Sequence, residues 1–134
     1  MAGTLSETDT DTLRRSYHAL NEGDVDRALE ALHADAVWHE SPELPGGDEF
    51  NGREAVRGFL RDFLAEWQEF HQEVEETVVA GDRVAVLIHL TATGRVSGIV
   101  ADTRYGHVWT MRGGKGIRVD GYRDQEAARR SLGS

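Results

Sequence analysis

The stretch HVWTMRGGKGIRVDGYRD, residues 107–124, decides the fold of this chain. Its alternating apolar positions on both sides of the glycine pair at 113–114 predict two strands joined by a turn, and Asp124 is a natural cap for a final helix. Alternate residues of a strand share one face of a sheet, so we expect His107 beside Trp109. An ionisable ring among apolar neighbours is the first candidate for chemistry in this sequence.

Composition limits the class of protein. The chain has 134 residues, 39% hydrophobic and 29% charged, which predicts one globular domain spanning 1–134. A formal net charge of −9 repels phosphate backbones, so we expect no nucleic-acid partner. The absence of cysteine excludes disulfides and thiol chemistry. No apolar stretch has membrane-spanning length and no secretory pattern opens the sequence, so we expect a soluble, cytoplasmic protein without a membrane partner.

Hydrophobic spacing predicts the order of the remaining elements. Helical periodicity extends over 8–21, over 24–32 and most clearly over 53–67, where apolar residues recur at intervals of three and four. The prolines and glycines between Ser41 and Asn51 predict a loop. Strand alternation is found over 36–41, 71–80, 84–91, 100–112 and 115–123, and a short helix follows Asp124.

This order of elements predicts the fold class. Helices gathered on one side of an antiparallel sheet define an α+β fold. We predict a cone-shaped, curved antiparallel (mixed) sheet, with three N-terminal helices that enclose a pocket and a short C-terminal helix. Concavities of this kind are ordinary sites for small ligands.

Several segments carry a resemblance to a known family. They are YHALNEGD at 17–24, LHADAVWH at 32–39, NGREAV at 51–56, and HVW at 107–109 with Gly114-Lys115 and 122–124. The chain resembles the SnoaL-like or ketosteroid-isomerase-like branch of the nuclear transport factor 2-like superfamily over nearly its whole length. The resemblance implies the cone-shaped fold. It leaves the activity open, because this fold hosts isomerases, polyketide cyclases, epoxide hydrolases, dehydratases and noncatalytic adaptors.

The resemblance also implies positions for catalytic groups. Ketosteroid isomerases use an aspartate base, and a tyrosine with a protonated acid binds the oxyanion. The position of the base is occupied here by Ser41, which follows His39 and Glu40. His107 stands at the position of the oxyanion acid, and the hydroxyl donor falls within one residue of Tyr17. The strand phase of the family favours His39 and Ser41 pointing inward, and Glu40 is the alternative base.

The candidate catalytic residues are therefore His107, His39 and Glu40. A neutral imidazole both donates and accepts hydrogen bonds, and an apolar cone disfavours its charged form, so His107 suits acid/base work or oxyanion binding. The competing interpretation makes His107 a hydrogen-bonded pocket residue and His39 a residue packed against the third helix. The candidate substrate-binding residues, which also have the pattern of an ordinary core, are Tyr17, Trp109, Ser41, Trp38, Phe59, Phe63, Val86, Ile88 and Val119.

We expect no metal site and no cofactor. The histidines lack the HxH and HExxH spacings of metal sites, and no glycine-rich phosphate loop precedes a helix. The alternation that directs His107 inward directs an apolar patch outward, and such patches mark interfaces. The resemblance implies sheet-to-sheet pairing, so we expect a homodimer through this outer face, which carries Leu87, His89, Thr91, Val108 and Thr110.

Two functions remain open at this point. The first is a cofactor-independent enzyme that moves a proton beside the carbonyl of a hydrophobic cyclic or polyketide-like substrate, in an isomerisation, cyclisation or dehydration. In it His39 or Glu40 moves the proton and His107 stabilises the enolate oxygen. The second is a noncatalytic module that binds a small hydrophobic molecule or serves in dimerisation. A third function, epoxide hydrolysis, needs an Asp-Arg-Asp set, of which 102–104 supplies only a fragment.

Overall fold

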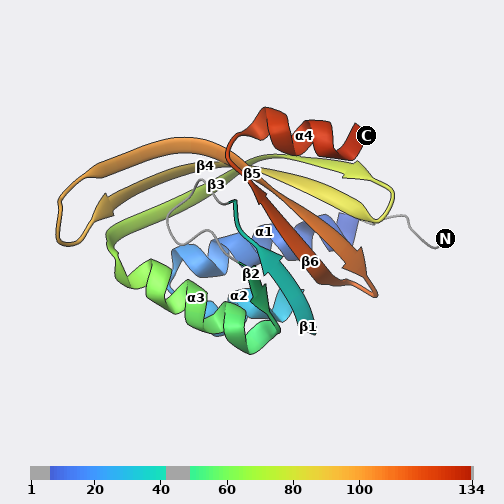
Figure 1. Ribbon diagram of the computed structural model, residues 1–134, viewed down its shortest axis with the longest axis horizontal. Helices are drawn as coiled ribbons and strands as arrows, with labels where there is room; N and C mark the ends of the chain where they lie inside the picture. The colour runs from blue at the N-terminus through green and yellow to red at the C-terminus, as the bar shows by residue number, and fades with distance from the viewer. Residues whose placement is uncertain (1–6, 42–48, 134) are drawn as a thin grey trace.

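A six-stranded, strongly curved sheet forms the centre of the computed structural model, which describes residues 7–41 and 49–133 (Figure 1). The strands lie in the order β2-β1-β6-β5-β4-β3. β1 pairs with β6 in parallel and every other neighbouring pair is antiparallel, so the sheet is mixed. The strands are β1 (Leu32–His39), β2 (Glu49–Asn51), β3 (Trp67–Ala80), β4 (Arg83–Gly94), β5 (Val100–Arg112) and β6 (Lys115–Tyr122).

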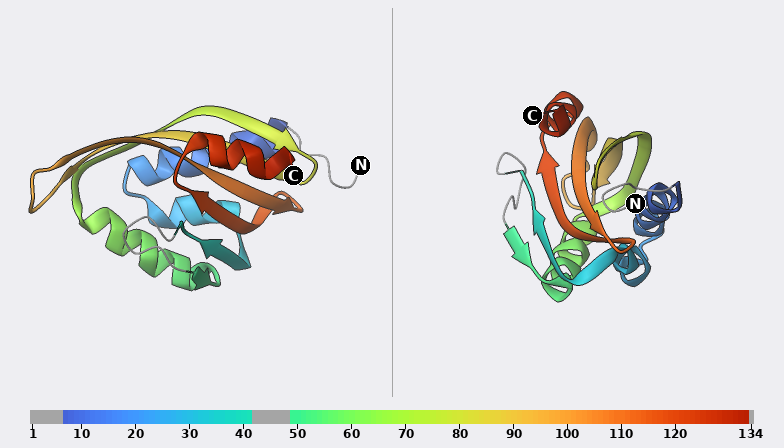
Figure 2. Two further views of the ribbon diagram at one scale, coloured as in Figure 1. Left: turned by 45° about the horizontal axis from the view of Figure 1, so that its top comes forward. Right: turned by 90° about the vertical axis from the view of Figure 1, so that its right-hand side faces the viewer.

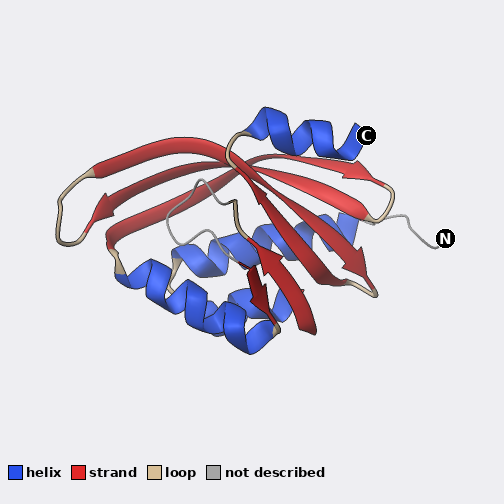
Figure 3. Ribbon diagram, in the orientation of Figure 1, coloured by secondary structure: helices blue, strands red, loops and turns tan. Residues whose placement is uncertain are grey.

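Helices cover both faces of this sheet (Figures 2 and 3). The N-terminal helices lie on its concave side, and the C-terminal helix lies across the opposite side. This arrangement confirms the predicted α+β fold with N-terminal helices, a mixed sheet and a short C-terminal helix. The helices are α1 (Glu7–Asn21), α2 (Val25–Ala28), the 3-10 turn η1 (Leu29–Ala31), α3 (Arg53–Ala65) and α4 (Gln125–Gly133).

Local sequence explains where α1 and α2 begin and end. Leu13, Tyr17 and Leu20 recur at helical spacing, and all three are buried. α1 stops before Gly23, whose φ of 78° is a left-handed conformation that glycine adopts without strain. The Asp24 side chain then accepts a hydrogen bond from a backbone N–H of the first turn of α2, as an N-cap does.

The structure differs from the sequence-based prediction most clearly at β1, β3 and β2. β1 begins at Leu32, where a second helix was expected to continue, because Leu32 pairs with Gly116 of β6. β3 begins at Trp67 rather than at residue 71, since Trp67 pairs with the end of β4. Within the predicted loop, β2 pairs with β1, and Phe50 stacks on Phe59 with ring centroids 4.4 Å apart. Residues 42–48 of that loop lie outside the described residues.

The outer face of the sheet is not the open apolar patch that we expected. Leu87 and Val108 are buried there, because α4 packs over them with Ala128. The packing is close at Gly106 of β5, where an added Cβ would lie 2.5 Å from the Ala128 Cβ. The chain's own last helix thus covers the apolar residues on which the expected dimer interface rested, and the homodimer stays a prediction.

Candidate active site

The interior of the molecule holds a cluster of buried polar side chains. Tyr17 comes from α1, Glu40 directly follows β1, and His107 lies in the middle of β5. Their residues are 3%, 6% and 4% exposed, respectively. The sheet brings Glu40 and His107 together because β1 and β5 both pair with β6, on its two edges. Burial of three polar groups in one place is costly unless each has a partner, so the contacts among them are informative.

Hydrogen bonds connect α1 to β5. The Tyr17 Oη lies 2.6 Å from the His107 Nδ1 and accepts a 2.9 Å hydrogen bond from the Trp109 Nε1. The phenol is protonated, as its raised pKa requires, so its own hydrogen is free to point at the His107 Nδ1. When the Nδ1 accepts this hydrogen, the hydrogen of the imidazole ring itself is on Nε2.

That second ring nitrogen faces Glu40. The His107 Nε2 lies 3.8 Å from the Glu40 Oε1, which is too far for a hydrogen bond but within ion-pair range. The other carboxylate oxygen, Oε2, accepts a 2.9 Å hydrogen bond from the Trp38 Nε1. The Glu40 Oε1 is buried and has no hydrogen-bond partner. An acceptor without a partner and an imidazole N–H therefore stand side by side.

Gly121 of β6 makes room for this carboxylate. Gly121 pairs directly with His107 across the sheet, and a Cβ added to it would overlap the Glu40 Oε1 and lie 3.2 Å from the Glu40 Cδ. Real Cβ atoms do not approach so closely, so any larger residue here would displace the Glu40 side chain. The absence of a side chain at 121 is thus part of how the fold positions Glu40.

The protein environment sets the charge of each group. Burial raises the pKa of the Glu40 carboxyl, but the nearby His107 imidazole and the hydrogen bonds from Trp38 and the backbone of Ser41 outweigh it, and the pKa lies below its ordinary value. Burial raises the pKa of Tyr17 well above its ordinary value, although the Trp109 N–H opposes this. At neutral pH the cluster therefore contains a carboxylate beside a protonated phenol.

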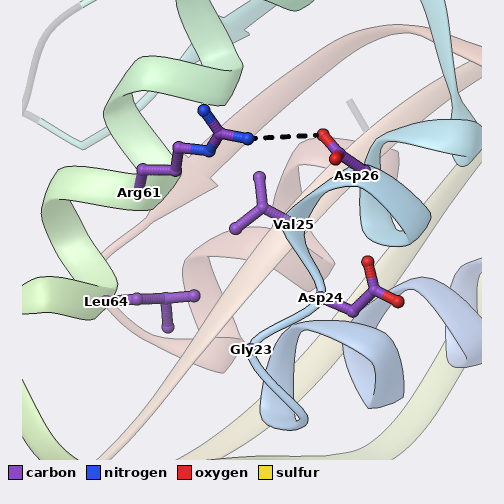
Figure 4. Close-up of a pocket in the computed structure, with 6 residues that line it drawn as sticks. All are labelled: Gly23, Asp24, Val25, Asp26, Arg61 and Leu64. Carbon is purple, nitrogen blue, oxygen red and sulfur yellow. Dashed lines mark ion pairs between the residues drawn. The ribbon is translucent and has the colours of Figure 1, made fainter.

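Two hollows in the described part of the chain lie beside the N-terminal helices. One of about 260 Å³ lies between α2 and α3, where Figure 4 shows Val25 and Leu64 approaching each other below the Arg61–Asp26 ion pair. It does not include any of the predicted site residues. The other, of about 240 Å³, lies between α1 and β3 and is lined in part by Tyr17 and Gln72. Tyr17 makes this second hollow a neighbour of the buried polar cluster.

Comparison with known proteins assigns the chain to a family. The sequence model of the SnoaL-like domain family matches residues 13–119 of this chain. The chain belongs to the SnoaL-like family. Residues 13–119 include the whole buried cluster, from Tyr17 of α1 to His107 of β5, so the SnoaL-like domain contains the candidate site. No curated protein matches the sequence.

Solved structures share this SnoaL-like fold. A nuclear transport factor 2-like protein from Burkholderia pseudomallei is 24% identical over 96% of this chain and 100% of that chain, with a TM-score of 0.80. TerC, co-crystallised with polyporic acid, is 23% identical over 96% and 100%, with a TM-score of 0.78. A ketosteroid isomerase-like protein from Catenulispora acidiphila, in complex with trimethylamine, is 15% identical over 97% and 95%, with a TM-score of 0.75. At sequence identities this low, the structural similarity establishes a common fold alone.

The expected inward direction of His39 is wrong for this SnoaL-like chain. The His39 side chain is 43% exposed, and its Nδ1 lies 3.8 Å from the Asp120 Oδ1 on the side away from His107. Glu40 points inward instead, together with Ala36 and Trp38, all of which are buried. The buried i, i+2, i+4 positions define the inward face, and the apolar Ala36 and Trp38 in the sequence are a signal for it.

The remaining predicted residues divide into two groups. Tyr17 and Trp38 lie against His107: the Trp38 ring centroid is 5.1 Å from that of His107, and the Tyr17 ring stacks on it at 5.8 Å. Trp109 contacts both of these residues. Ser41 is also buried. The other five pack in or against the hydrophobic core, where Val86, Ile88 and Val119 are fully buried and Phe59 and Phe63 are half-buried on α3. Their role toward a substrate stays a prediction.

The buried polar pair of Gln72 and Tyr105 was not among the residues predicted from the sequence. Gln72 of β3 is buried, and its Nε2 donates a hydrogen bond to the Tyr105 hydroxyl. The Tyr105 ring lies 5.2 Å from that of His107, and burial raises the pKa of this phenol too. Tyr105 shares the alternation phase of His107 and Trp109, so this residue was recognisable from the sequence. Gln72 was not, because it stands in a run of polar residues at the start of a strand.

Two further findings concern metals and membranes. Within residues 7–41 and 49–133, no three histidine, aspartate or glutamate side chains gather in a way that could hold a metal ion. No helix among the same residues is long and apolar enough to cross a membrane.

Proposed function

We propose that this protein is a cofactor-independent acid/base enzyme that moves a proton beside the carbonyl of a hydrophobic cyclic or polyketide-like molecule. The observation that carries the proposal is the buried pair of Glu40 and His107. The Glu40 Oε1 has no hydrogen-bond partner, and the His107 Nε2 lies 3.8 Å away. A base and a hydrogen-bond donor held side by side in a dry interior are what enolisation requires.

Glu40 has the role of the base. Its pKa lies below the ordinary value, so the carboxylate is charged at neutral pH and ready to accept a proton. Two hydrogen bonds, from the Trp38 indole and the Ser41 backbone, hold it in place. A hydrophobic substrate that entered between Glu40 and His107 would separate the carboxylate from the imidazole. Loss of that partner raises the pKa of Glu40 and makes it a stronger base when substrate is present.

His107 has the role of the oxyanion donor. The Tyr17 hydroxyl at 2.6 Å holds the Nδ1 as an acceptor, so the Nε2–H is the atom that can bind a developing enolate oxygen. The Trp109 N–H orients that hydroxyl in turn. Tyr17 and Trp109 therefore position the donor and need not touch the substrate themselves.

Relatives of the same fold support a small-molecule partner. TerC was co-crystallised with polyporic acid, and the Catenulispora acidiphila protein was solved with trimethylamine. For the present chain we infer a largely apolar ligand, because the rings around His107 belong to Trp38, Tyr105 and Tyr17. Aromatic walls favour flat, unsaturated or cyclic molecules.

The test is carbon-bound proton exchange. A panel of cyclic ketones and cyclic 1,3-diketones is incubated with the protein in D2O, and loss of the α-proton signal is followed by NMR. We expect Glu40→Gln to lower the catalysed rate by about a hundredfold or more, because general-base catalysis typically contributes that much. His39→Asn is the matched control, since His39 is adjacent in sequence but points outward. Equal rates in Glu40→Gln and the wild type would contradict the proposal.

A noncatalytic binding module is the second candidate. The observation that favours it is the closure of the cluster: Tyr17, Glu40 and His107 are all at most 6% exposed. Such a module would bind a member of the same panel and gain thermal stability from it, without any exchange of α-protons. A shift in melting temperature together with exchange no faster than in Glu40→Gln would establish this alternative.

A further inference from the structure

Gln72 of β3 is a buried polar residue that the proposed function does not use. Gln72 is 5% exposed, and its Nε2 donates a hydrogen bond to the Tyr105 hydroxyl. The other terminal atom of the same side chain, Oε1, is buried and has no hydrogen-bond partner. A buried polar atom without a partner lowers the stability of a fold, so its presence in the interior needs an explanation.

The pair of Gln72 and Tyr105 lies on the concave face of the sheet, as the candidate site does. Gln72 pairs with Leu90 of β4, and Tyr105 of β5 pairs with Ile88, two positions earlier on β4. Leu90, Ile88 and Tyr105 all belong to the hydrophobic core on the concave side. The Tyr105 ring centroid is 5.2 Å from that of His107. The polar pair is therefore a neighbour of the proposed oxyanion donor.

This pair has one free donor and one free acceptor. When the Gln72 Nε2 donates to Tyr105, the Oε1 is the free acceptor, and the Tyr105 hydroxyl keeps its own hydrogen to donate. If the carboxamide turned by half a rotation, Tyr105 would donate to Oε1 and Nε2 would be the free donor, beside the second lone pair of the phenol oxygen. Both orientations leave a donor and an acceptor at one place.

The Tyr105 phenol keeps its hydrogen at neutral pH. Burial raises its pKa, and the negative charge of Glu40 raises it further. Ionisation of Tyr105 would place a second negative charge in the interior that already contains the Glu40 carboxylate. The pair therefore presents a neutral hydrogen-bonding surface, which suits a neutral polar group and not an anion.

We infer that Gln72 and Tyr105 bind a hydroxyl group of the substrate, away from the carbonyl on which Glu40 and His107 act. A hydroxyl group both donates and accepts hydrogen bonds, so it satisfies the pair in either orientation of the amide. A carbonyl group only accepts, and it would leave the Gln72 Oε1 without a partner. The inference rests on the proposed function, because it specifies the substrate class of the same site: a hydroxylated cyclic ketone.

The distance between the two polar regions indicates the size of this ketone. Tyr105 and His107 are two residues apart on β5, which is about 6–7 Å along a strand. A carbonyl on one ring and a hydroxyl on a second, fused ring have a comparable separation. A hydroxyl bound beside Tyr105 would also fix how the ring system is turned, and so which α-carbon faces the Glu40 Oε1.

The test compares the binding of 2-tetralone, a ketone of two fused rings, with that of its isomers that carry one hydroxyl group on the aromatic ring. Isothermal titration calorimetry measures each dissociation constant. We expect at least one hydroxylated isomer to bind the wild type about tenfold or more tightly than 2-tetralone, because its hydroxyl satisfies the buried pair. In Gln72→Met, which keeps the shape of the side chain, this preference should fall to about twofold or less.

Gln68→Met is the matched control. It makes the same change on the same strand, but Gln68 is exposed, so the preference for the hydroxylated isomer should persist. Equal binding of all the ketones to the wild type, or no binding of any, overturns the inference. A preference that survives in Gln72→Met, or that Gln68→Met also abolishes, does the same.

A double variant separates ligand binding from a purely structural role and remains informative if Gln72→Met does not fold. Gln72→Met with Tyr105→Phe removes the whole polar pair and leaves apolar side chains of similar shape. Without ligand, we expect its midpoint of denaturant unfolding to be at least as high as that of the wild type, because a buried unpartnered atom is lost with its neighbour. A lower midpoint would show that the pair serves the stability of the fold, and the inference would be wrong.

This binding test is independent of the α-proton test on Glu40→Gln. Loss of the hydroxyl preference with a normal Glu40→Gln effect would leave the enzyme and remove the substrate class. A clear hydroxyl preference with no effect of Glu40→Gln would leave a binding module that recognises hydroxylated ketones.

Discussion

The two faces of β5 differ although their residues alternate along one strand. His107 points to the concave face, where it meets a phenol and a carboxylate, whereas the next residue, Val108, points to the convex face and belongs to an apolar cluster under α4. Both side chains are buried. Polar groups lower stability when they are removed from water, so a face built for stability alone would resemble the convex one. The contrast supports the function that we propose for the concave face.

Two glycines make the same contrast visible in the backbone. Gly106 allows α4 to approach the convex face, where its nearest neighbour is the Ala128 Cβ. Gly121 allows the Glu40 carboxylate to approach the concave face. At each glycine the missing side chain leaves room for a close contact, with a helix on the convex face and with a carboxylate on the concave face.

The largest effect that we expect on the convex face comes from Leu87→Ala. Leu87 is fully buried under α4, and loss of a buried leucine side chain lowers the free energy of unfolding by about 2–5 kcal/mol. Denaturant unfolding measures this loss. The 15N shifts of His107 should not change, because the two faces are separate clusters. Altered shifts would show that the faces are coupled and would break the comparison.

A smaller effect is expected from Gly106→Ala, because the new methyl group would overlap Ala128. Overpacking of this kind lowers the free energy of unfolding by about 1–3 kcal/mol. Amide hydrogen exchange should become faster within α4. The matched control is Gly58→Ala in α3, where an added Cβ meets nothing within 4 Å. That helix position should gain up to about 1 kcal/mol. A destabilisation of equal size in both variants would rule out the close fit of α4 as the cause.

The smallest expected effect is on the free energy of unfolding at acidic pH, and it tests the concave face. The pKa of Glu40 is lower in the folded chain than its ordinary value, so Glu40 stabilises the fold above the pKa of the unfolded state and loses this contribution as the pH falls through the folded-state pKa. Unfolding free energies of Glu40→Gln and the wild type should therefore converge as the pH falls below about 4.3, the ordinary pKa of glutamate.

Glu75→Gln is the comparison for this pH effect. Hydrogen bonds from Gln125 and Arg104 lower the pKa of Glu75 as well, but Glu75 lies at the surface. Salt screens exposed charges much more than buried ones. High salt should therefore weaken the pH effect at Glu75 and leave that at Glu40 almost unchanged. Equal sensitivity to salt at both positions would mean that water reaches Glu40, and the dry interior proposed for the site would be wrong.

Much of the fold was predictable because its signals are local. The alternation along β4 and β5 separated the two faces, and α4 began after Asp124 as its capping residue predicted. Short elements were harder. β2 has three residues and exists only because β1 lies beside it, so no pattern within residues 49–51 could reveal it.

The candidate site was predictable in its members but not in its connections. His107, Tyr17 and Trp109 were recognisable from their periodicity, since each lies in a regular element. The family's strand phase favoured His39 inward with Glu40 as the alternative, and the structure turns Glu40 inward. Both residues stand where β1 ends, and a shift of one residue turns every side chain to the other face. The buried Ala36 and Trp38 settle the phase only when the rest of the sheet is in place.

By itself, the sequence determined the order of the helices and of the longer strands and which of their residues are apolar, because those properties depend on spacing along the chain. Only the tertiary structure decided that Glu40 meets His107 beside Gly121, that the Tyr17 hydroxyl reaches the imidazole, and that α4 covers Leu87. The physical reason is that these contacts join residues far apart in sequence, and their geometry depends on how a curved sheet brings strands together across β6.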